Sequence, residues 1–344
     1  MSSRHQGLGG KPLGSDSPLF GGESKPEQAN GSPDAVPPGA VPPWDPRSDP
    51  YAAAVDPEPS PQELAAAEAQ LEGLRDLLPA AEDGRSLDDW GRSEAVVSLI
   101  DPLLNFYYRY WFRVETEGIE NIPTNGGALL VSNHSGALPP DGPMIMQAIR
   151  NEHPSPRPLY MLGEHWFRGY PGVAMIANKM GLVPAHRDNA QRLLHDEGRL
   201  AVVFPEGQKG TRKLYWQRYR LRRFGRGGFV RTAIRARVPV VPIALVGGEE
   251  AMPIFAHLRL LQKLSGLIYF PVTPTFPLFG LAAGMLYMPA KFRIRFLEPI
   301  DMSQYPPETA SDPAAIQEIS EKIRAGIQIE LDQMISRRKS VWMG

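Results

Sequence analysis

The sequence predicts an α/β fold for residues 116–305, with a mostly parallel central sheet flanked by helices. Three features support this prediction. Short apolar runs typical of buried strands recur along this part of the chain. Segments with apolar residues at helical spacing alternate with these runs, an order typical of a parallel sheet. Polar residues follow directly after several of the runs, and the carboxyl ends of such strands are the usual place for a functional site.

Residues 1–60 predict a disordered tail. They hold few aliphatic side chains and many of the 36 Pro and 33 Gly residues of the chain. Such a segment cannot bury enough apolar surface to offset the entropy lost on folding. It also lacks the apolar segment of a signal peptide. We therefore expect the folded part of the protein on the cytoplasmic side of a membrane.

Residues 61–115 predict N-terminal helices. Ser60 suits the N-cap and Pro61 the first position of a short helix. Residues 86–113 then run from an acidic start into an apolar and aromatic stretch that Pro102 interrupts. Tyr, Trp and Arg along such an amphipathic stretch suit a bilayer interface, and a helix packed on the core fits the pattern equally well. Both interpretations stay open.

The central domain contains the strands and helices of the predicted sheet. In chain order we expect a strand at 127–133, a helix at 143–150, strands at 158–163 and 181–187, a helix at 189–194, a strand at 200–204, a helix at 228–236, and strands at 238–246 and 291–296. Pro239 and Pro242 are unusual in a central strand, so at least one of them should lie at a strand end. An amphipathic helix at 312–338, within the C-terminal segment 306–344, packs on the domain.

The first candidate site is His134, which follows Asn133 at the carboxyl end of a predicted strand. A His that accepts a proton near neutral pH needs a carboxylate to fix its tautomer and to stabilise the imidazolium. Asp141 is the only carboxylate nearby. A structural hydrogen bond within one loop is the alternative, and the spacing alone does not decide between them.

The second candidate site follows the strand at 200–204. Glu206 and Gly207 form a carboxylate on a tight turn, and the cations Lys209 and Arg212 come after it with Thr211 between them. This arrangement suits a site that binds a phosphate, whereas a solvated turn with a basic tail is the alternative. Arg187 also has the side chain best suited to bidentate phosphate contact, although a plain surface Arg is the default interpretation.

Several classes of protein are disfavoured. The chain has no cysteine, which excludes disulfides, thiolate metal sites and a cysteine nucleophile. The sequence also lacks the Gly-x-Ser-x-Gly motif of an α/β-hydrolase. The seven His residues show no ligand-like pairing such as His-Glu-x-x-His, so no metal site is expected.

Four features occur in a fixed order. They are Asn133-His134 with Asp141, Gly-x5-Arg ending at Arg187, Phe-Pro-Glu-Gly ending at Gly207 with Thr-Arg at 211–212, and Val-Pro-x-x-Pro at 238–242. Together they resemble the glycerolipid acyltransferase family, of which lysophosphatidate acyltransferases are typical. The resemblance covers roughly residues 110–300. It implies transfer of a fatty acyl group from acyl-CoA or acyl-carrier protein to a glycerolipid hydroxyl, first of all that of 1-acylglycerol-3-phosphate to give phosphatidate.

The resemblance also implies roles for individual residues. His134 is the general base and Asp141 its partner. Asp141 lies seven positions after the His instead of the family's five, and Gln-Lys-Gly at 208–210 splits the family's Glu-Gly-Thr-Arg. The substrate-binding residues are expected to include cations that hold an acceptor phosphate, a carboxylate that orients a donor or acceptor hydroxyl, and neighbouring polar or small residues, namely Asn133, Arg187, Glu206, Gly207, Lys209, Thr211 and Arg212. No cofactor is expected beyond the acyl thioester co-substrate.

Two segments suit contact with lipid. Residues 209–226 contain eight Lys or Arg and no acid, interleaved with aromatic residues, a mixture that suits anionic headgroups or a CoA phosphate. A solvated face and a nucleic-acid surface are the alternatives, and the net charge of −1 argues against nucleic acid. Residues 264–290 are uncharged and long enough to span a bilayer, but Pro271, Pro274 and Pro277 break a helix there. We expect a loop and short helix that line an acyl groove or enter the interface.

The expected location is the cytoplasmic face of a membrane, with peripheral or monotopic attachment, and the oligomeric state stays open. Two other functions fit the same features. One is a neutral-lipid acyltransferase that acts on mono- or diacylglycerol. The other is a non-catalytic lipid-binding module, which would keep the fold and need no ionisable pair in its pocket.

Overall fold

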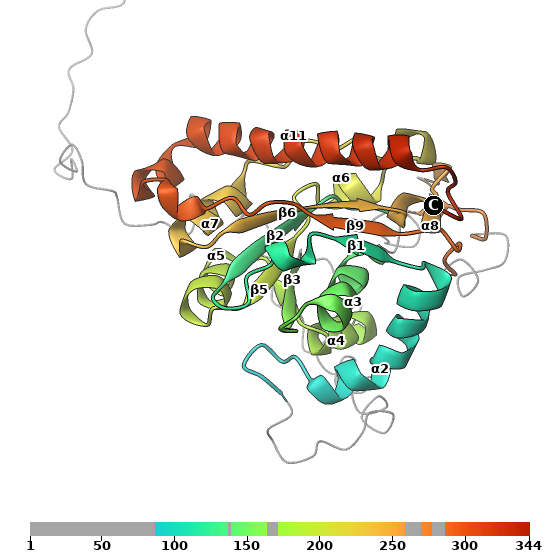
Figure 1. Cartoon of the computed structure of the whole chain (residues 1–344), viewed down its shortest axis with the longest axis horizontal. Coiled ribbons are helices and arrows are strands. Elements are labelled where there is room, and N and C mark those ends of the chain that lie inside the picture. Colours follow the sequence, from blue (N-terminus) through green and yellow to red (C-terminus); the bar gives the residue numbers. More distant parts are fainter. Residues whose placement is uncertain (1–86, 137–138, 164–170, 259, 261–269, 277–285) are drawn as a thin grey trace, which may run out of the picture. The chain divides into compact units, whose positions relative to one another are not determined.

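The apolar run Ala128–Ser132 forms β2, the central strand of a seven-stranded sheet in the computed structural model (Figure 1). On one side of β2 lie β5 (Leu200–Val203), β3 (Leu159–Gly163) and β4 (Leu182–Pro184), all parallel. On the other side β6 (Val240–Val246) is parallel to β2, and β9 (Arg293–Phe296) is antiparallel to β6. The edge strand β1 (Glu115–Glu117) is parallel to β9. The predicted mostly parallel central sheet is therefore confirmed.

The structure describes residues 87–136, 139–163, 171–258, 260, 270–276 and 286–344. The predicted tail at 1–60, the helix from Pro61 and most of the uncharged run at 264–290 lie outside these residues. A two-stranded antiparallel sheet, β7 (Ala256–His257) with β8 (Pro271–Val272), stands apart from the main sheet. The α-helices in the described residues are α2 (Glu94–Phe106), α3 (Asp141–Glu152), α4 (Pro171–Lys179), α5 (Arg187–Gln191), α6 (Gln208–Thr211), α7 (Gly228–Ala236), α8 (Gly248–Ala251) and α11 (Pro313–Arg337).

Short turns of 3-10 and π-helix connect these elements. The 3-10 turns are η4 (Ile119–Asn121), η7 (Tyr215–Gln217), η8 (Met302–Gln304) and η9 (Pro307–Ser311). The π-helical turns η3 (Tyr107–Trp111) and η6 (Arg192–Asp196) extend α2 and α5. None of the helices in the part of the chain that the structure describes has the length and apolar character needed to cross a membrane.

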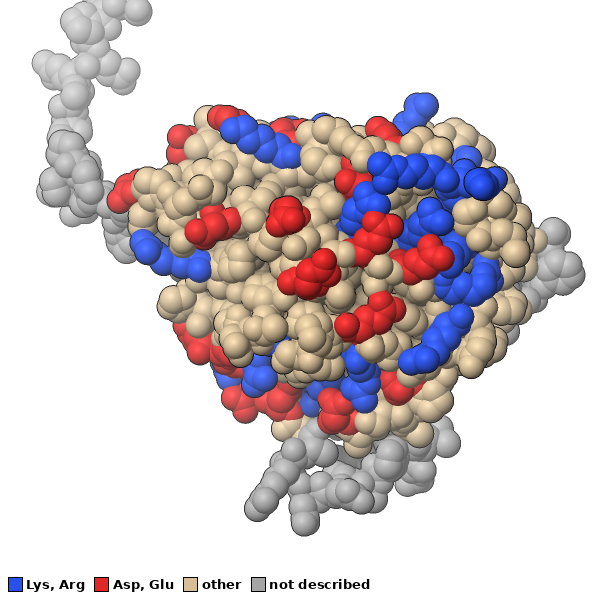
Figure 2. Space-filling view, viewed as in Figure 1, with Lys and Arg blue, Asp and Glu red and all other residues tan. Residues whose placement is uncertain are grey.

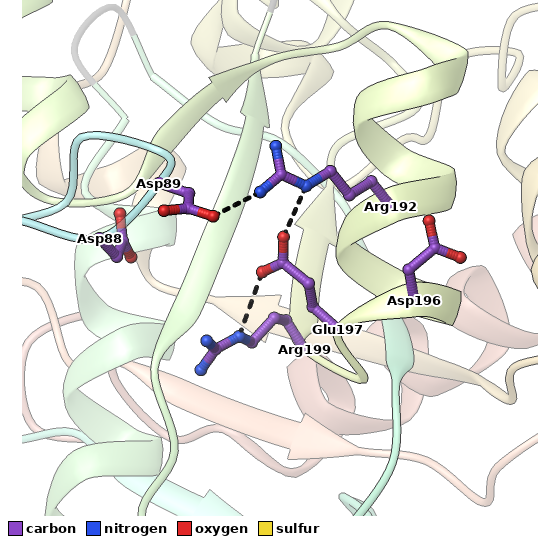
Figure 3. Close-up of a pocket in the computed structure, with 6 residues that line it drawn as sticks. All are labelled: Asp88, Asp89, Arg192, Asp196, Glu197 and Arg199. Atoms are coloured by element: carbon purple, nitrogen blue, oxygen red, sulfur yellow. Dashed lines mark hydrogen bonds and ion pairs between the residues drawn. The ribbon is translucent and has the colours of Figure 1, made fainter.

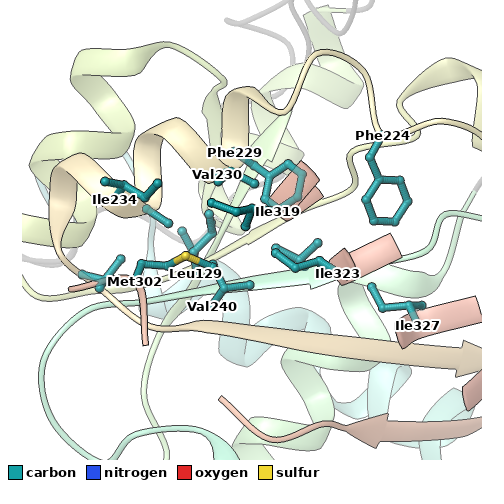
Figure 4. Close-up of a cluster of buried hydrophobic side chains, with 14 of the residues drawn as sticks. Leu129, Phe224, Phe229, Val230, Ile234, Val240, Met302, Ile319, Ile323 and Ile327 are labelled. Carbon is teal, nitrogen blue, oxygen red and sulfur yellow. The ribbon is translucent and has the colours of Figure 1, made fainter. Parts of the chain in front are cut away.

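Helices cover both faces of the sheet because successive side chains of a buried strand point to opposite faces. Leu129 of β2 packs with Phe229 and Val230 of α7 and with Ile323 of α11 (Figure 4). Leu130, one position later, belongs to the cluster on the other face, with Ile145 of α3. Figure 1 shows α11 and α7 on one side of the sheet, with α2, α3 and α4 on the other.

Two predictions about local structure turn out differently. The helix α2 begins at the Ser93 N-cap, whose hydroxyl accepts from the Val96 N–H, and continues through Pro102 to residue 106. Pro102 is exposed, so the carbonyl that loses its helical partner can meet water, and the expected break does not occur. The run predicted as a strand at 181–187 is strand only at 182–184, and Arg187 begins α5.

The prolines of β6 are accommodated as the sequence predicts. Pro239 precedes the strand, whereas Pro242 lies within it. The Pro242 carbonyl accepts from the Leu297 N–H at 2.8 Å, just beyond the end of β9. The missing N–H of Pro242 therefore falls where the pairing with β9 ends.

The β1–β9 edge is lined with opposite charges. Glu115 accepts from Lys291 and Arg293, and Glu117 pairs with Arg295. Figure 2 shows acidic and basic side chains interspersed on this face, with Lys and Arg gathered toward the side where the C-terminus lies in Figure 1. Such charges hinder the pairing of an edge strand with another chain.

Candidate active site

Three chain segments meet at the carboxyl end of the sheet. The strands β2, β5 and β6 are adjacent and parallel, so the residues that follow them share one edge. Asn133 and His134 follow β2, Phe204 to Gly207 follow β5, and Gly247 and Gly248 follow β6. The first two segments are those that the sequence analysis selects.

His134 and Asp141 are within hydrogen-bond distance. His134 Nδ1 lies 2.9 Å from Asp141 Oδ2, and the Asp141 side chain is completely buried. The same carboxylate accepts from the Ser135 N–H at 2.8 Å and from the Ser135 hydroxyl at 2.5 Å. Asp141 is also the first residue of α3, where the helix dipole favours a negative charge. The loop with two extra residues thus brings the carboxylate to the imidazole.

The His134 ring has one nitrogen that faces away from this pair. Its side chain is 16% exposed, and Nε2 has no hydrogen-bond partner among the described residues. The ring stacks on Phe204, with centroids 4.2 Å apart and planes 18° from parallel. A His whose Nδ1 is held by a buried carboxylate presents Nε2 as its proton acceptor.

Glycines let two neighbouring segments approach this pair. A Cβ on Gly210 of α6 would lie 2.9 Å from the Cβ of His134, and a Cβ on Gly248 would lie 2.0 Å from Ser135 Oγ and 2.6 Å from Asp141 Oδ1. Gly207 has φ +53°, in the region that glycine favours. The close packing leaves His134 and Asp141 little freedom to move.

Asn133 connects two strands. Its side-chain amide donates to the Leu245 carbonyl at 2.9 Å, and its side-chain oxygen accepts from the Leu245 N–H at 2.8 Å. The residue is fully buried. These contacts fix the end of β2 against β6, so the structure gives Asn133 a positioning role instead of the expected substrate contact.

Glu206 is also enclosed, although the sequence predicts that it orients a substrate hydroxyl. Its side chain has no exposed surface. Oε1 accepts from the His134 N–H at 3.1 Å, and Oε2 accepts from the Arg222 N–H at 2.8 Å. The structure corrects the expected role, because the carboxylate holds the His134 loop and has no exposed surface with which to contact a substrate.

A buried lysine completes the surroundings of Glu206. Lys213 Nζ lies 3.3 Å from each Glu206 oxygen and 2.6 Å from Glu249 Oε1 in α8. Burial raises the pKa of Glu249 to about 7, against the opposing effect of Lys213. Burial alone would lower the pKa of Lys213, but the charges of Glu249 and Glu206 outweigh it and the net shift is upward. Lys213 therefore carries its positive charge inside the protein.

A second buried group lies next to it. Glu249 Oε2 accepts from the Tyr219 N–H at 2.7 Å, and the Tyr219 hydroxyl donates to Glu250. Arg338, which follows α11, donates to Glu250 at 2.7 Å. Gln328 of α11 donates to the Tyr219 carbonyl at 2.9 Å and accepts from the Leu221 N–H at 2.9 Å. The C-terminal helix thus holds the segment that carries Lys213.

Lys213 and Glu249 are not among the predicted site residues. Lys213 looks like one of the eight cations of a basic stretch, and only contacts with distant residues reveal that it is buried. A signal for Glu249 existed, because Gly-Gly-Glu-Glu at 247–250 follows a strand end in the same way as Asn133 does.

The predicted phosphate-binding residues are placed unequally. Lys209 and Arg212 are exposed, Lys209 within α6 and Arg212 directly after it, and Gly210 of the same helix touches His134. Thr211 is buried, and its hydroxyl donates to the Gln208 carbonyl at 3.2 Å. Arg187 is exposed beyond β4, three strands from β2, which corresponds to about 14 Å across the sheet. The structure brings Lys209 and Arg212 near His134 and leaves Arg187 apart.

Aromatic side chains pack together near His134 and Asp141. Tyr107, Phe112 and Tyr287 pack edge to face or tilted, and the Trp111 indole donates to the Tyr287 carbonyl at 3.0 Å. Burial, together with the negative charge of Asp141, raises the pKa of Tyr287, which therefore stays a neutral hydroxyl.

Two cavities lie at the opposite, amino end of the strands. One, of about 560 Å³, is lined by Asp88, Asp89, Arg192, Asp196, Glu197 and Arg199 (Figure 3). The other, of about 390 Å³, lies between residues that precede β2 and β6. Neither includes a residue of the His134 site. Within the described ranges no group of three or more His, Asp or Glu side chains could hold a metal ion.

The chain is similar to several known proteins. The family model named Acyltransferase matches residues 113–246. An uncharacterised protein of Mycobacterium tuberculosis (strain ATCC 25618 / H37Rv) is 42% identical over 289 residues, which cover 83% of this chain and 79% of that protein. An uncharacterised protein of Mycobacterium leprae (strain TN) is 44% identical over 247 residues, 72% of this chain and 67% of that protein.

More distant matches have descriptive names. A protein of Gallus gallus named "DGAT1/2-independent enzyme synthesizing storage lipids" is 27% identical over 247 residues, 72% of this chain and 66% of that protein. The crystal structure of a 1-acyl-sn-glycerophosphate acyltransferase, PlsC, from Thermotoga maritima is 18% identical, with a TM-score of 0.47, and the match covers 79% of this chain and 90% of that one.

Proposed function

The chain belongs to the glycerolipid acyltransferase family, as its four ordered motifs predict, and on this premise we propose that it transfers a fatty acyl group from an acyl thioester to a glycerolipid hydroxyl with His134 as general base. The observation that carries the proposal is the 2.9 Å contact between His134 Nδ1 and the buried Asp141 carboxylate. This contact leaves Nε2 to accept a proton.

The proposed reaction needs no covalent acyl-enzyme. His134 Nε2 takes the proton of the acceptor hydroxyl as its oxygen attacks the thioester carbonyl carbon, and Asp141 stabilises the imidazolium that forms. The tetrahedral intermediate then collapses, the carbon–sulfur bond breaks, and the imidazolium returns the proton to the thiolate of CoA or of a carrier protein. The products are the acylated glycerolipid and the free thiol.

The acceptor that we propose first is 1-acylglycerol-3-phosphate, which gives phosphatidate. Lys209 and Arg212 support it, because both are exposed cations on either side of the turn that touches His134. Replacing both with Ala should raise KM for lysophosphatidate about tenfold or more, since each charge-assisted contact contributes roughly 1.5–3 kcal/mol. KM for monoacylglycerol, which has no phosphate, should stay within about twofold.

Mono- or diacylglycerol is the second candidate acceptor. The name of the Gallus gallus relative, a storage-lipid enzyme, favours it. Offering lysophosphatidate, glycerol 3-phosphate and diacylglycerol side by side to the purified protein, with acyl-CoA as donor, separates the two. Turnover of diacylglycerol alone would remove phosphate recognition from the proposal, and acyl transfer that persists in His134→Ala would remove the base.

We also propose peripheral or monotopic attachment to the cytoplasmic face of a membrane. Four apolar side chains on α2 and η3 support it, spaced four, three and four residues apart and 46–71% exposed, namely Leu99, Leu103, Phe106 and Tyr110. The buried residues of α2, Val96 and Val97, lie in its first turn. Replacing Leu99 and Leu103 with Ser should release the protein from anionic vesicles in a flotation assay, whereas high salt alone should not.

A further inference from the structure

We propose that Lys213 and Glu249 are positioning residues of the active site, which hold the His134 loop through Glu206 and set the electrostatic environment of the base. This inference rests on the proposed role of His134. It concerns the buried ion-paired group of Lys213, Glu206 and Glu249, which contacts the backbone of the His134 loop and takes no part in the proposed proton transfer.

A continuous chain of contacts leads from Glu249 to His134. Lys213 Nζ contacts Glu249 Oε1 at 2.6 Å and both oxygens of Glu206 at 3.3 Å. Glu206 Oε1 in turn accepts from the His134 N–H at 3.1 Å. Without Lys213, two buried carboxylates would face each other, and Glu206 would lose the cation that keeps it in place to hold His134.

Burial makes this chain a rigid support. The side chains of Lys213, Glu206 and Glu249 are 2%, 0% and 5% exposed. In such surroundings charges are weakly screened, and removing one partner leaves an uncompensated charge. The segment from Lys213 to Tyr219 is fixed at its other end by Glu249 and Gln328, so Lys213 cannot easily reach solvent.

The group also affects the charge near the base. Lys213 with Glu206 is neutral, and ionised Glu249 adds one negative charge. Burial is the main cause of the raised pKa of Glu249, and the negative charges of Glu206 and Asp141 add to it, so Glu249 and Asp141 interact. The charge of Glu249 therefore acts on Asp141, the carboxylate that contacts His134 Nδ1 at 2.9 Å.

The charged or titratable side chains around Glu249 come from five segments. They are His134 and Asp141 by the first motif, Glu206 after β5, Lys213, Arg218 and Tyr219 after α6, the adjacent Glu250, and Arg338 after α11. Glu250 pairs with Arg218 and Arg338. Glu249 and Glu206 both pair with the single cation Lys213.

The test compares purified variants of the full chain in acyl transfer from acyl-CoA. Lys213→Met should lower kcat at least tenfold and change KM for acyl-CoA less than twofold. Lys213→Arg, which keeps the charge, should recover part of the loss. The matched control is Lys291→Met, because Lys291 is similarly buried and pairs with Glu115 away from the site. Its kcat should stay within twofold of the wild type.

A pH profile separates positioning from simple packing. Glu249→Gln keeps the shape of the side chain and removes its charge. Because Glu249 has a pKa of about 7 and is only partly ionised along the acidic limb of kcat/KM, this limb should move to lower pH by roughly 0.2–0.5 unit. A packing role would leave this limb in place. If Lys213→Met does not fold, as judged by circular dichroism, Glu249→Gln decides the question.

His134→Ala is assayed in parallel. If it is inactive while folded Lys213→Met keeps its kcat or Glu249→Gln keeps its acidic limb, the positioning inference is wrong and the base assignment stands. If His134→Ala retains turnover, the base assignment itself is wrong, and the positioning inference falls with it.

Discussion

Charged side chains gather at both ends of the sheet, and the two groups differ in burial. At the carboxyl end Lys213 is 2% exposed between Glu206 and Glu249. At the amino end Arg192 bridges Asp89 and Glu197, with Arg192 46% and Asp89 79% exposed (Figure 3). Water screens the second group, whereas the first is held in weakly screened surroundings. Similar residue types thus make a rigid support at one end and a solvated surface at the other.

The largest difference is expected for the two histidines at these ends. His134→Ala should lower kcat by about 10²–10⁴, the usual contribution of a general base. His195→Ala, which removes only the bond from the ring to the Ala236 carbonyl near the amino end, should change kcat less than twofold. Steady-state assays with acyl-CoA and lysophosphatidate measure both, and equal effects would abolish the functional contrast between the two ends.

The second difference is in stability. Lys213→Ala leaves the buried Glu206 and Glu249 without their cation and should lower the free energy of unfolding by about 3–5 kcal/mol. Arg192→Ala breaks exposed ion pairs and should cost less than about 1 kcal/mol. Urea unfolding followed by circular dichroism gives both values. A Lys213 variant as stable as the Arg192 variant would mean that burial does not distinguish the two groups.

The third difference depends on pH. The pKa of Glu249 is raised from 4.5 to about 7 in the folded protein, so the folded state binds this proton more tightly than the unfolded chain. The contribution of the protonated Glu249 carboxyl to the free energy of unfolding is therefore complete below about pH 4.5 and is lost as the pH rises to about 7. Relative to the wild type, Glu249→Gln should gain stability over this window, by on the order of 3 kcal/mol.

Melting temperatures of the two proteins between pH 4.5 and 8 test this. A difference that stays constant with pH would show that Glu249 does not titrate in this range.

The smallest effect is expected from a change in packing next to Asp141. Gly248→Ala would place a Cβ 2.6 Å from Asp141 Oδ1, so Asp141 or α8 must move, at a cost of about 1–3 kcal/mol and with a loss of activity. Gly228→Ala in α7 is the control, because its Cβ would meet nothing within 4 Å. If Gly248→Ala kept both its activity and its melting temperature, the site would be less tightly packed than the distances indicate.

Local patterns revealed much of this architecture. The apolar runs predict the central strands, and residues placed directly after them lead to His134 and Glu206. Arg187 shows the limit of such patterns. Its separation from His134 depends on the order of strands in the sheet, which a sequence pattern does not specify. Burial is equally hard to predict from a local pattern. Lys213 is buried because it pairs with Glu249, 36 positions later, and because a helix near the end of the chain holds its segment.

The contacts of α11 have a consequence for dissecting the protein. A boundary at residue 305, where the sequence suggests that the central domain ends, would remove Gln328 and Arg338. Tyr219 would then lose the hydrogen bond from Gln328, and Glu250 would lose the Arg338 guanidinium. A shortened protein that kept all four motifs would therefore lack part of their scaffold, so the smallest independent catalytic unit extends through the C-terminal helix.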